Sequence, residues 1–476
     1  MKKSMALALI ATLISATSLS TSYAATSKSG TGKGSGNGSG SNRGVQDGAL
    51  CSSTGPKNAR TSAGVELECQ KGGDGKYAWH PPMGGSGGSK GGAAPKSLSD
   101  VWGKDKCSGT STKITHGIID PSKISYIVPM GAMLSSHITP IDHIYIYFPS
   151  NPGSNSGQAI EKPAGTYLVT SPAAGKIVSV EDFAKTNDYP YADYRIVISH
   201  SCNLYSVFIH VGKLMGAAAQ IVSKIGANGS WGGSVAVKAG EKIADDSEKP
   251  NFDYSLFDGT KKLKGFANLK SYSQAEQWKP WTADILSYLP KSLKSAYEDK
   301  FLATAAPIGG RIDWDLSGTA QGNWFAQNTN GYRGVGDQSA SYNNHGKVAR
   351  GYWDTHLAIA PDAIDRKATI FSIGDWEGCP CQFVSKDPNV TGSTIKSSSG
   401  VTVIELTEFE FKSPTGETVD RSQPTKGYKV VSSGPVLGLL AVEVSADGTM
   451  KVEKLPGKTS KSDFMAFSSA AKVYVR

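Results

Sequence analysis

Histidine, cysteine and long apolar runs are scarce in this sequence. Of its 476 residues only eight are histidine and six are cysteine. Beyond the first 25 residues no segment is apolar enough to cross a membrane, so we expect no membrane span. Lysine and arginine do not form a basic stripe interleaved with stacking aromatics, which argues against nucleic acid as a partner. What the sequence does contain is a large number of short β-type runs.

The first residues predict a secretory signal peptide. Lys2 and Lys3 form a positively charged start, residues 5–14 form an apolar run, and residues 22–24 offer a small-residue cleavage site. A membrane anchor is the alternative, but the run is too short to span a bilayer. No cysteine lies at the cleavage site, so no lipid anchor is indicated. We expect a secreted protein, extracellular or wall-associated, and the dispersed formal charge of +9 suits a place beside anionic cell-wall polymers.

The six cysteines can all be paired in an exported chain. Cys51 and Cys69 flank one small segment, so we expect a local disulfide between them. Cys107 and Cys202 could then tie the start of a β domain to a histidine-bearing strand. The Cys-Pro-Cys triplet at 379–381 could close a small ring or act as a redox pair, and the sequence leaves the pairing of these last four cysteines open. A zinc knuckle would need further Cys or His residues near the triplet, and none is present.

Composition divides the chain into seven segments. Two Gly-rich stretches are typical of flexible tethers, and the unit between them is too small to bury a full core without its disulfide. The predicted segments are a signal peptide (1–24), a Gly/Ser linker (25–47), a small disulfide module (48–82), a Gly-rich linker (83–97), a β domain (98–259), a helical connector (260–306) and a C-terminal β domain (307–476).

Strand-like runs predominate from residue 98 onward. Runs rich in Val, Ile, Tyr and Thr, bounded by Gly, Pro, Ser or Asn, are typical of strands. They predict a mainly β fold with an antiparallel sheet first and an antiparallel sandwich or barrel after it. The second region includes expected strands at 309–318 and a hairpin centred on 446–448. The connector carries helical periodicity broken at Pro280 and Pro290, with a helix start at Thr282.

Five polar residues of the first β domain are candidates for a zinc site. His137, Asp142 and His143 lie around the turn into a strand, and His200 and His210 lie on adjacent strand positions if the hairpin between them forms. Two or three histidines and a carboxylate could hold zinc, which would lower the pKa of a bound water for amide hydrolysis. The alternative is that Asp142 and His143 cap a turn while His200 and His210 fill polar core positions.

Two further patterns lie in the C-terminal region. Asp313, Asp315 and Gly318 have the opening spacing of a calcium loop, but Trp324 stands where its glutamate ligand belongs. A tight turn is the favoured interpretation. A second set places aromatic and polar groups together and could stack on sugar rings in a glycan groove, with core packing as the favoured alternative. Its members are Trp353, Asp354 and His356, together with Tyr352 and residues 323–325.

Three stretches of the first β domain resemble the lysostaphin-type zinc metallopeptidases. SPAAGKIVSV (171–180) matches the family's Gly-x-Val strand, YSVFIHVGKL (205–214) its histidine strand, and VKAGEKIA (237–244) its glycine turn. The resemblance spans roughly residues 130–258, about a quarter of the chain. It implies a sheet of the duplicated hybrid motif type and gives His210 the place of a catalytic histidine that polarises a scissile carbonyl.

The chain departs from that family at the metal ligands. The family uses His-x-x-x-Asp, whereas His137 precedes Asp142 by five positions. An upstream pair with the family spacing, His116 and Asp120, lies far before the Gly-x-Val strand. The closing His-x-His is replaced by NFDYSLFD (251–258), which contains no histidine. A catalytic zinc site needs three protein ligands, so the resemblance implies a domain degenerate at its metal site.

The sequence therefore supports three hypotheses. The first is a secreted, envelope-associated protein with a degenerate peptidase-like domain, without cofactor, that binds peptidoglycan or another wall glycan or regulates a wall hydrolase. The second is an active zinc-dependent peptidoglycan endopeptidase with a rearranged ligand set drawn from His137 or His143, Asp142 and His210. The third is a structural surface protein.

Overall fold

The computed structural model describes residues 96–150, 162–187, 190–334, 352–420 and 422–476, together with the backbone of three strands between residues 58 and 80. The chain divides into two compact units, Met1–Gly84 and Gly85–Arg476. The two predicted β regions thus belong to one unit. The predicted signal peptide, the first linker, the second linker up to residue 95 and the expected Cys51–Cys69 bridge lie outside the described residues.

The first unit contains a three-stranded antiparallel sheet. Its order is β1 (Asn58–Arg60), β2 (Glu66–Lys71) and β3 (Tyr77–His80). Both pairings are antiparallel. These strands fall inside the predicted small disulfide module, and Cys69 lies within β2.

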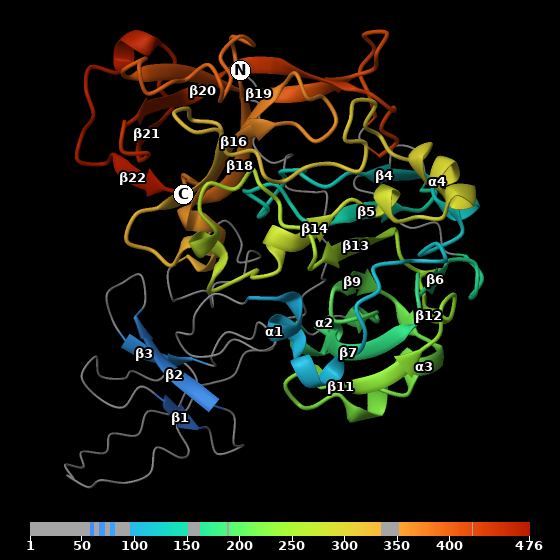
Figure 1. Cartoon of the computed structure of the whole chain (residues 1–476). Coiled ribbons are helices and arrows are strands. Elements are labelled where there is room, and N and C mark those ends of the chain that lie inside the picture. The colour runs from blue at the N-terminus through green and yellow to red at the C-terminus, as the bar shows by residue number, and fades with distance from the viewer. Residues whose placement is uncertain are drawn as a thin grey trace, which may run out of the picture. The chain divides into compact units, whose positions relative to one another are not determined.

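An eight-stranded antiparallel sheet is the centre of the second unit. Figure 1 shows its strands succeeding one another from β11 to β4. Along the sheet these are β11 (Ser230–Val237), β7 (Gly175–Asp182), β8 (Tyr194–Ser199), β9 (Leu204–Val211), β13 (Asn251–Asp258), β5 (Ile144–Tyr147) and β4 (Tyr126–Val128), with β14 (Thr282–Ala283) also paired to β13.

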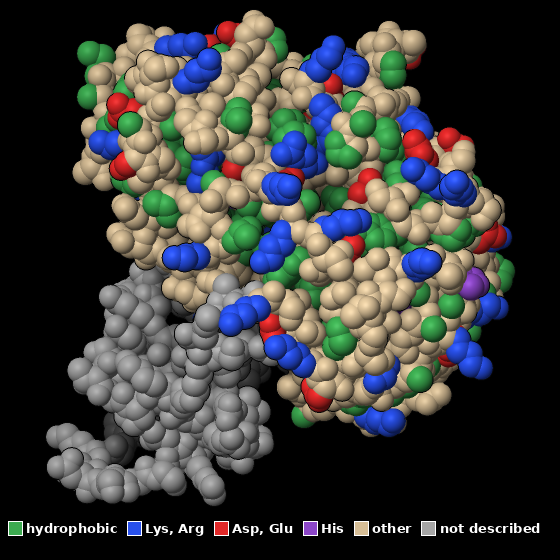
Figure 2. All heavy atoms as spheres, viewed as in Figure 1, with side chains coloured by type: hydrophobic (Ala, Val, Ile, Leu, Met, Phe, Trp, Pro, Cys, Tyr) green, Lys and Arg blue, Asp and Glu red, His purple; other side chains and the backbone are tan. Residues whose placement is uncertain are grey.

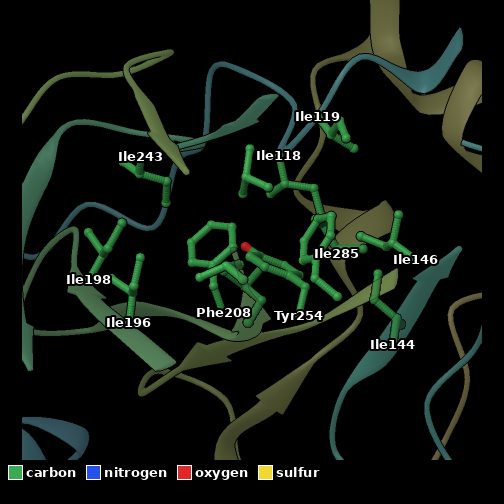
Figure 3. Close-up of a cluster of buried hydrophobic side chains, with 14 of the residues drawn as sticks. Ile118, Ile119, Ile144, Ile146, Ile196, Ile198, Phe208, Ile243, Tyr254 and Ile285 are labelled. Atoms are coloured by element: carbon green, nitrogen blue, oxygen red, sulfur yellow. The ribbon is translucent and has the colours of Figure 1, made fainter. Parts of the chain in front are cut away.

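Both faces are buried in the middle of this sheet, which explains the apolar runs of β8 and β9. Successive side chains of a strand point to opposite faces. On β8, Ile196 and Ile198 enter the main core while Val197 enters a second cluster on the other face. Phe208 and Val207 divide in the same way on β9. Figure 3 shows the main core, where isoleucines from several strands surround Phe208 and Tyr254.

The second cluster is anchored by helix α1 (Leu98–Trp102). Trp102 packs against Tyr205, with ring centroids 4.8 Å apart. Close by, a disulfide joins Cys107 to Cys202 in the turn between β8 and β9. The bridge that the sequence left open is therefore formed, and it fixes the segment after α1 to the β8–β9 hairpin.

A small sheet and short helices complete this region. The sheet is β10 (Lys213–Leu214), β12 (Lys242–Asp245) and β6 (Leu168–Thr170), in that order. The helices are α2 (Phe183–Asn187) and α3 (Gly216–Ala219), with 3-10 turns η1 (Lys104–Lys106), η2 (Pro121–Lys123) and η3 (Val222–Lys224). Main-core residues from β12, such as Ile243, close over β8 and β9.

The predicted connector is only partly helical. One α-helix forms, α4 (Lys291–Glu298), directly after Pro290. The rest consists of 3-10 turns, η4 (Leu269–Tyr272), η5 (Lys279–Trp281) and η6 (Ile285–Ser287). The predicted helix start at Thr282 is wrong, because Thr282 pairs with Phe257 as part of β14 and Asp284 caps the following 3-10 turn.

The C-terminal region forms a closed antiparallel barrel, the second of the two architectures expected. Consecutive strands pair, and β15 closes the barrel on β22. The strands are β15 (Gly322–Ala326), β16 (His356–Pro361), β17 (Thr369–Trp376), β18 (Cys379–Ser385), β19 (Thr402–Lys412), β20 (Lys429–Val444), β21 (Met450–Pro456) and β22 (Lys472–Val475). Short 3-10 turns η7 (Gly331–Arg333), η8 (Tyr352–Thr355) and η9 (Lys461–Asp463) lie between them.

The barrel tests several sequence predictions. The hairpin around 446–448 is confirmed, since Val444 pairs with Met450 across the β20–β21 turn. The strand expected at 309–318 is wrong, because no strand is assigned there. The carboxylates of this stretch instead accept hydrogen bonds from backbone amides. Cys379 and Cys381 form a disulfide within β18. Among the described residues, none of the helices has the length and apolar character that a membrane crossing requires.

Candidate functional site

Three neighbouring strands bring polar side chains to one face of the large sheet. Asp253 on β13 lies opposite Ile209 of β9 on one side and Tyr145 of β5 on the other. Asp142 and His143 immediately precede β5. Both are buried, as is Asp253. The sheet thus concentrates ionisable groups in a region where each charge must find a partner, because burial strongly penalises an isolated charge.

His210 lies beside this group, at a bulge near the end of β9. The β8–β9 register shifts between Tyr194 and Ile196, and His210 has φ 63°. A positive φ is unusual for a residue other than glycine and is a form of local strain found at functional sites. Bulges redirect side chains, and here the imidazole reaches Asp193. Its Nδ1 lies 3.1 Å from both carboxylate oxygens.

The His210 imidazole is the accessible member of the group. Its side chain is 38% exposed, whereas that of Asp193 is 4% exposed. Lys249 Nζ lies 3.6 Å from the same carboxylate. Burial works against the charged imidazole, but the hydrogen bond to Asp193 and the nearby Asp253 raise the pKa of His210 above its usual value. With Nδ1 donating to Asp193, Nε2 is left to contact a ligand.

Asp142 is held by groups from the connector. Its Oδ2 accepts a hydrogen bond from Trp278 Nε1 at 2.9 Å, and its Oδ1 lies 3.2 Å from His143 Nδ1. Lys279 Nζ lies 3.8 Å from the same Oδ1. Burial alone would raise the pKa of Asp142, but the Lys279 ammonium and the His143 hydrogen bond outweigh it and lower that pKa. Asp142 is therefore an ionised carboxylate with its own internal cation.

Lys279 has a second carboxylate partner, Glu276, with Nζ 3.2 Å from Oε2. The lysine residue is only 2% exposed. Burial favours the neutral amine, but Asp142 and Glu276 together raise the pKa of Lys279. Burial raises the pKa of Glu276, against the opposing effect of Lys279. The buried ammonium thus sits between the buried Asp142 carboxylate and the partly exposed Glu276 carboxyl group.

His137, His143 and Asp253 form the remaining part of the cluster. The His137 and His143 rings lie 5.5 Å apart, and His143 Nε2 is 3.6 Å from Asp253 Oδ2. Burial, His143 and Lys279 lower the pKa of His137 to about 3, so this imidazole is neutral. Among the described residues, His143 Nε2 and Asp253 Oδ1 are buried and have no hydrogen-bond partner, which in proteins goes with strain, a catalytic role or a bound water or ion.

The residues do not fit a catalytic zinc. The structure gathers the predicted ligands His137, Asp142 and His143, but both oxygens of Asp142 already have protein partners. A positive charge, Lys279, lies where a cation would approach that carboxylate. Within the described ranges, no three His, Cys, Asp or Glu side chains are placed to share one metal ion. We therefore derive no chemistry through a metal.

His200 does not join this group. The predicted hairpin forms, but its register pairs Ser199 with Tyr205, which puts His200 in the turn and His210 at the far end of β9. The Nδ1 of His200 donates to the Ala174 carbonyl at 3.3 Å, and its Nε2 lies 2.8 Å from Ser206 Oγ. Burial lowers the pKa of His200 to about 4. The imidazole is neutral and acts as a hydrogen-bonded core group.

The predicted glycan-binding set is mostly core. His356 is 1% exposed and its Nε2 donates to the Tyr332 carbonyl at 3.0 Å. Trp324 and Phe325 are buried on β15. The prediction that His356 contacts a glycan is therefore wrong, because the barrel wall covers it. Trp353 and Asp354 are half-buried at the start of β16, and the favoured core reading describes this set better.

The His356 imidazole makes a testable contribution to acid sensitivity. Its pKa is lowered by burial from 6.5 to about 3, so the unfolded chain binds a proton between these values while the folded chain does not. Stability from this group is present above pH 6.5 and is lost as the pH falls toward 3. Between pH 7.5 and pH 5 the wild-type free energy of unfolding should fall by about 2 kcal/mol more than that of His356→Gln. Urea titrations at both pH values measure it, and parallel pH profiles would contradict it.

The carboxylates at 313–318, which have the spacing of a calcium loop, accept hydrogen bonds from backbone amides. Asp313 Oδ2 accepts from the Gly265 amide at 2.7 Å, and Asp315 accepts from the amides of Ala267 and Asn323 at 2.8 and 2.7 Å. Asp313 Oδ1 accepts from the Arg311 side chain at 2.9 Å, so these carboxylates are used within the protein, which agrees with the turn interpretation.

Sequence reasoning missed four residues of the cluster: Asp193, Glu276, Trp278 and Lys279. Three of them belong to the connector, which was interpreted only as a helical link. The signal that could have found them is the segment Trp278-Lys279-Pro280-Trp281, where a lysine lies among aromatic residues and must either be exposed or be paired when buried.

Comparison with protein-family models, with curated proteins and with solved structures finds no match to this chain. The class of this protein therefore follows from its fold and its side-chain cluster alone. It is a two-part, mainly β protein with a buried histidine-carboxylate-lysine cluster on the central sheet. One partly exposed imidazole, His210, lies at the margin of that cluster.

Proposed function

We propose that this chain is an exported, envelope-associated protein whose large sheet binds peptidoglycan, or regulates a wall hydrolase, without cleaving the polymer itself. The observation that carries the proposal is the ion pair of Lys279 with Asp142. It places a protein cation beside the carboxylate that the lysostaphin-type resemblance would assign to a metal. A sheet with this arrangement keeps a binding surface but lacks the Lewis acid needed for amide hydrolysis.

The strand order supports the family resemblance on which the proposal rests. Two of the matched stretches are strands of the same sheet, β7 and β9, linked through β8. The third leads into β12, and the segment lacking the closing histidines is β13, hydrogen-bonded to β9. Two of the three matched stretches therefore lie in one sheet, and the third lies in the three-stranded sheet of β10, β12 and β6.

The proposed compartment is supported by the cysteines and by charge. Two disulfides, Cys107–Cys202 and Cys379–Cys381, are formed, and disulfides persist in oxidising compartments. Figure 2 shows Lys and Arg side chains distributed across the visible face and not confined to one patch. A dispersed positive charge favours weak, general attraction to anionic wall polymers.

His210 is the contact residue that the proposal predicts. Its exposed imidazole can donate from Nε2 to a carbonyl or carboxylate of a wall peptide while Asp193 fixes the ring. Replacing it in His210→Ala should weaken binding to purified sacculi at least tenfold, because a hydrogen bond to a charged group contributes about 1.5–3 kcal/mol. Cosedimentation at increasing sacculus concentration measures the affinity.

The matched control is His116→Ala, which removes an exposed histidine outside the cluster and should bind as wild type does. Equal losses in the two variants would contradict a specific role for His210. A wild-type protein that does not sediment with sacculi at all would remove the proposal and favour the structural surface protein.

The second candidate function is the zinc endopeptidase with rearranged ligands. It is favoured by one observation: within the described ranges, His143 Nε2 and Asp253 Oδ1 are buried and lack a hydrogen-bond partner, and the His143 ring lies next to that of His137. Elemental analysis of the purified wild-type protein decides between the two functions. Stoichiometric zinc together with chelator-sensitive cleavage of wall peptides would establish the enzyme and overturn the binding proposal.

A further inference from the structure

The connection between β21 and β22, residues 457–471, carries the most exposed large apolar side chain of the described residues. Met465 is 90% exposed, whereas the other exposed large apolar side chains there lie between 37% and 44%. Its neighbours are apolar too: Ala466 is exposed, and Phe464 and Phe467 are half-buried. One isolated apolar side chain is ordinary on a protein surface, but a contiguous apolar group indicates a contact surface. Figure 1 shows this connection, in red, at the outer margin of the barrel.

The 457–471 loop is braced by its own polar groups. The buried carboxylate of Glu453 on β21 accepts hydrogen bonds from the amide and the hydroxyl of Ser468, at 2.7 and 2.6 Å. Nearer the start of the loop, the Asp463 carboxylate accepts from the amides of Thr459 and Ser460, at 3.2 Å each. The exposed methionine thus projects from a preformed loop, so little conformational entropy is lost when a partner covers it.

Positive charge surrounds this apolar group. Lys458 and Lys461 are exposed on the same loop. The Lys451 ammonium, from β21, lies 4.7 Å from the centre of the Phe467 ring. The loop's own carboxylate, Asp463, is already engaged by backbone amides. The loop therefore presents an apolar tip with ammonium groups beside it.

We propose that the 457–471 loop attaches this protein to an anionic phospholipid surface, with Met465 entering the outer acyl region and Lys458 and Lys461 binding lipid phosphates. A bilayer offers an apolar phase directly beneath anionic headgroups, which matches the apolar tip and its flanking lysines. A hydrated wall polymer supplies the charge but no apolar phase. A second copy of this chain, contacting through the same loop, would place lysines against lysines. The inference goes beyond the proposed function, because it concerns another region and another partner.

Vesicle cosedimentation tests the apolar contact. Wild type should bind vesicles of phosphatidylglycerol mixed with phosphatidylcholine, and should bind them less as salt is raised. Met465→Ser should lower the affinity about tenfold, because it removes the side chain that leaves water. The matched control is Val401→Ser, which removes an apolar side chain that is 42% exposed just before β19. Consecutive strands of an antiparallel barrel alternate in direction, so the β18–β19 connection lies at the opposite end from the 457–471 loop. This control should bind as wild type does.

Charge reversal tests the lysines. Lys458→Glu/Lys461→Glu should lower the affinity for the anionic vesicles by more than about tenfold, because each lysine near such a surface contributes to binding. Lys386→Glu/Lys396→Glu makes the same change in net charge at two exposed lysines of the β18–β19 connection and should lose much less. All variants share the same N-terminal residues, so the differences report the loop. Equal urea midpoints for all variants, expected for exposed positions, exclude a folding defect.

Losses confined to the two loop variants support the proposal. A wild-type protein that does not bind the anionic vesicles overturns it. It is also overturned if the loop variants bind vesicles as wild type does and instead lose affinity for sacculi, which would identify a wall polymer as the partner. A wild-type dimer that Met465→Ser separates, with vesicle binding unchanged, would identify a second copy and overturn it as well. Sacculus binding through His210 stands or falls separately from each of the vesicle results.

Discussion

Removal of the Cys107–Cys202 disulfide should lower the free energy of unfolding by about 4–5 kcal/mol. The two cysteines are 95 positions apart, so the bridge closes a long loop in the unfolded chain. In the chain-entropy description, the stabilisation grows with the number of residues enclosed. The bridge also secures the segment after α1, whose Trp102 packs on the β9 side chain Tyr205.

The measurement is urea unfolding of a Cys107→Ser/Cys202→Ser variant against the oxidised wild type. The chain supplies a matched control in Cys379→Ser/Cys381→Ser, which removes a disulfide between residues only two positions apart. That bridge encloses almost no chain, so its removal should cost far less. Equal losses for the two double variants would show that loop closure is not the source of the stabilisation.

Replacement of Lys279 by methionine should destabilise the protein by about 3–5 kcal/mol, because it breaks a buried ion pair from one side only. Methionine retains similar bulk, so the main loss is the charge that compensates Asp142 and Glu276. Chemical denaturation at neutral pH measures the effect. Lys261→Met is the surface comparison. Its ammonium lies 3.7 Å from Asp258 but its side chain is 71% exposed, so a change of at most about 1 kcal/mol is expected.

A double variant tests the pairing itself. In the Lys279→Met variant, Asp142 is a buried carboxylate without its cation, and adding Asp142→Asn removes that charge. Part of the lost stability should return, because replacing both partners of a buried ion pair is often nearly neutral. Additive losses would mean that Lys279 stabilises the fold through packing and not through its charge.

The sheet was predictable from sequence because its signal is local. Short β-branched and aromatic runs with turn residues between them identify β5, β7, β9 and the β20–β21 hairpin. The pairing of these strands was harder to predict from the sequence. The separation of His200 from His210 depends on the β8–β9 register, which pairs Ser199 with Tyr205, and the runs alone do not specify that register.

The candidate site was predictable only in part, for a related reason. Asp142, His143 and His210 are chemically distinctive and were found. Lys279 and Glu276 were not, because a lysine in a polar connector normally reads as solvent-exposed. Lys279 begins the 3-10 turn η5, and the preceding Trp278 stacks on Trp102, with ring centroids 5.6 Å apart. That stacking joins segments far apart in the chain.

The closure of β15 onto β22 affects how this protein can associate with other chains. A sheet that closes on itself leaves no row of unsatisfied backbone amides and carbonyls along its margin. Along the closed part of the barrel that the structure describes, strand-by-strand growth into fibrils or domain-swapped polymers is therefore disfavoured. Any neighbour recognised there must be recognised through side chains and loops.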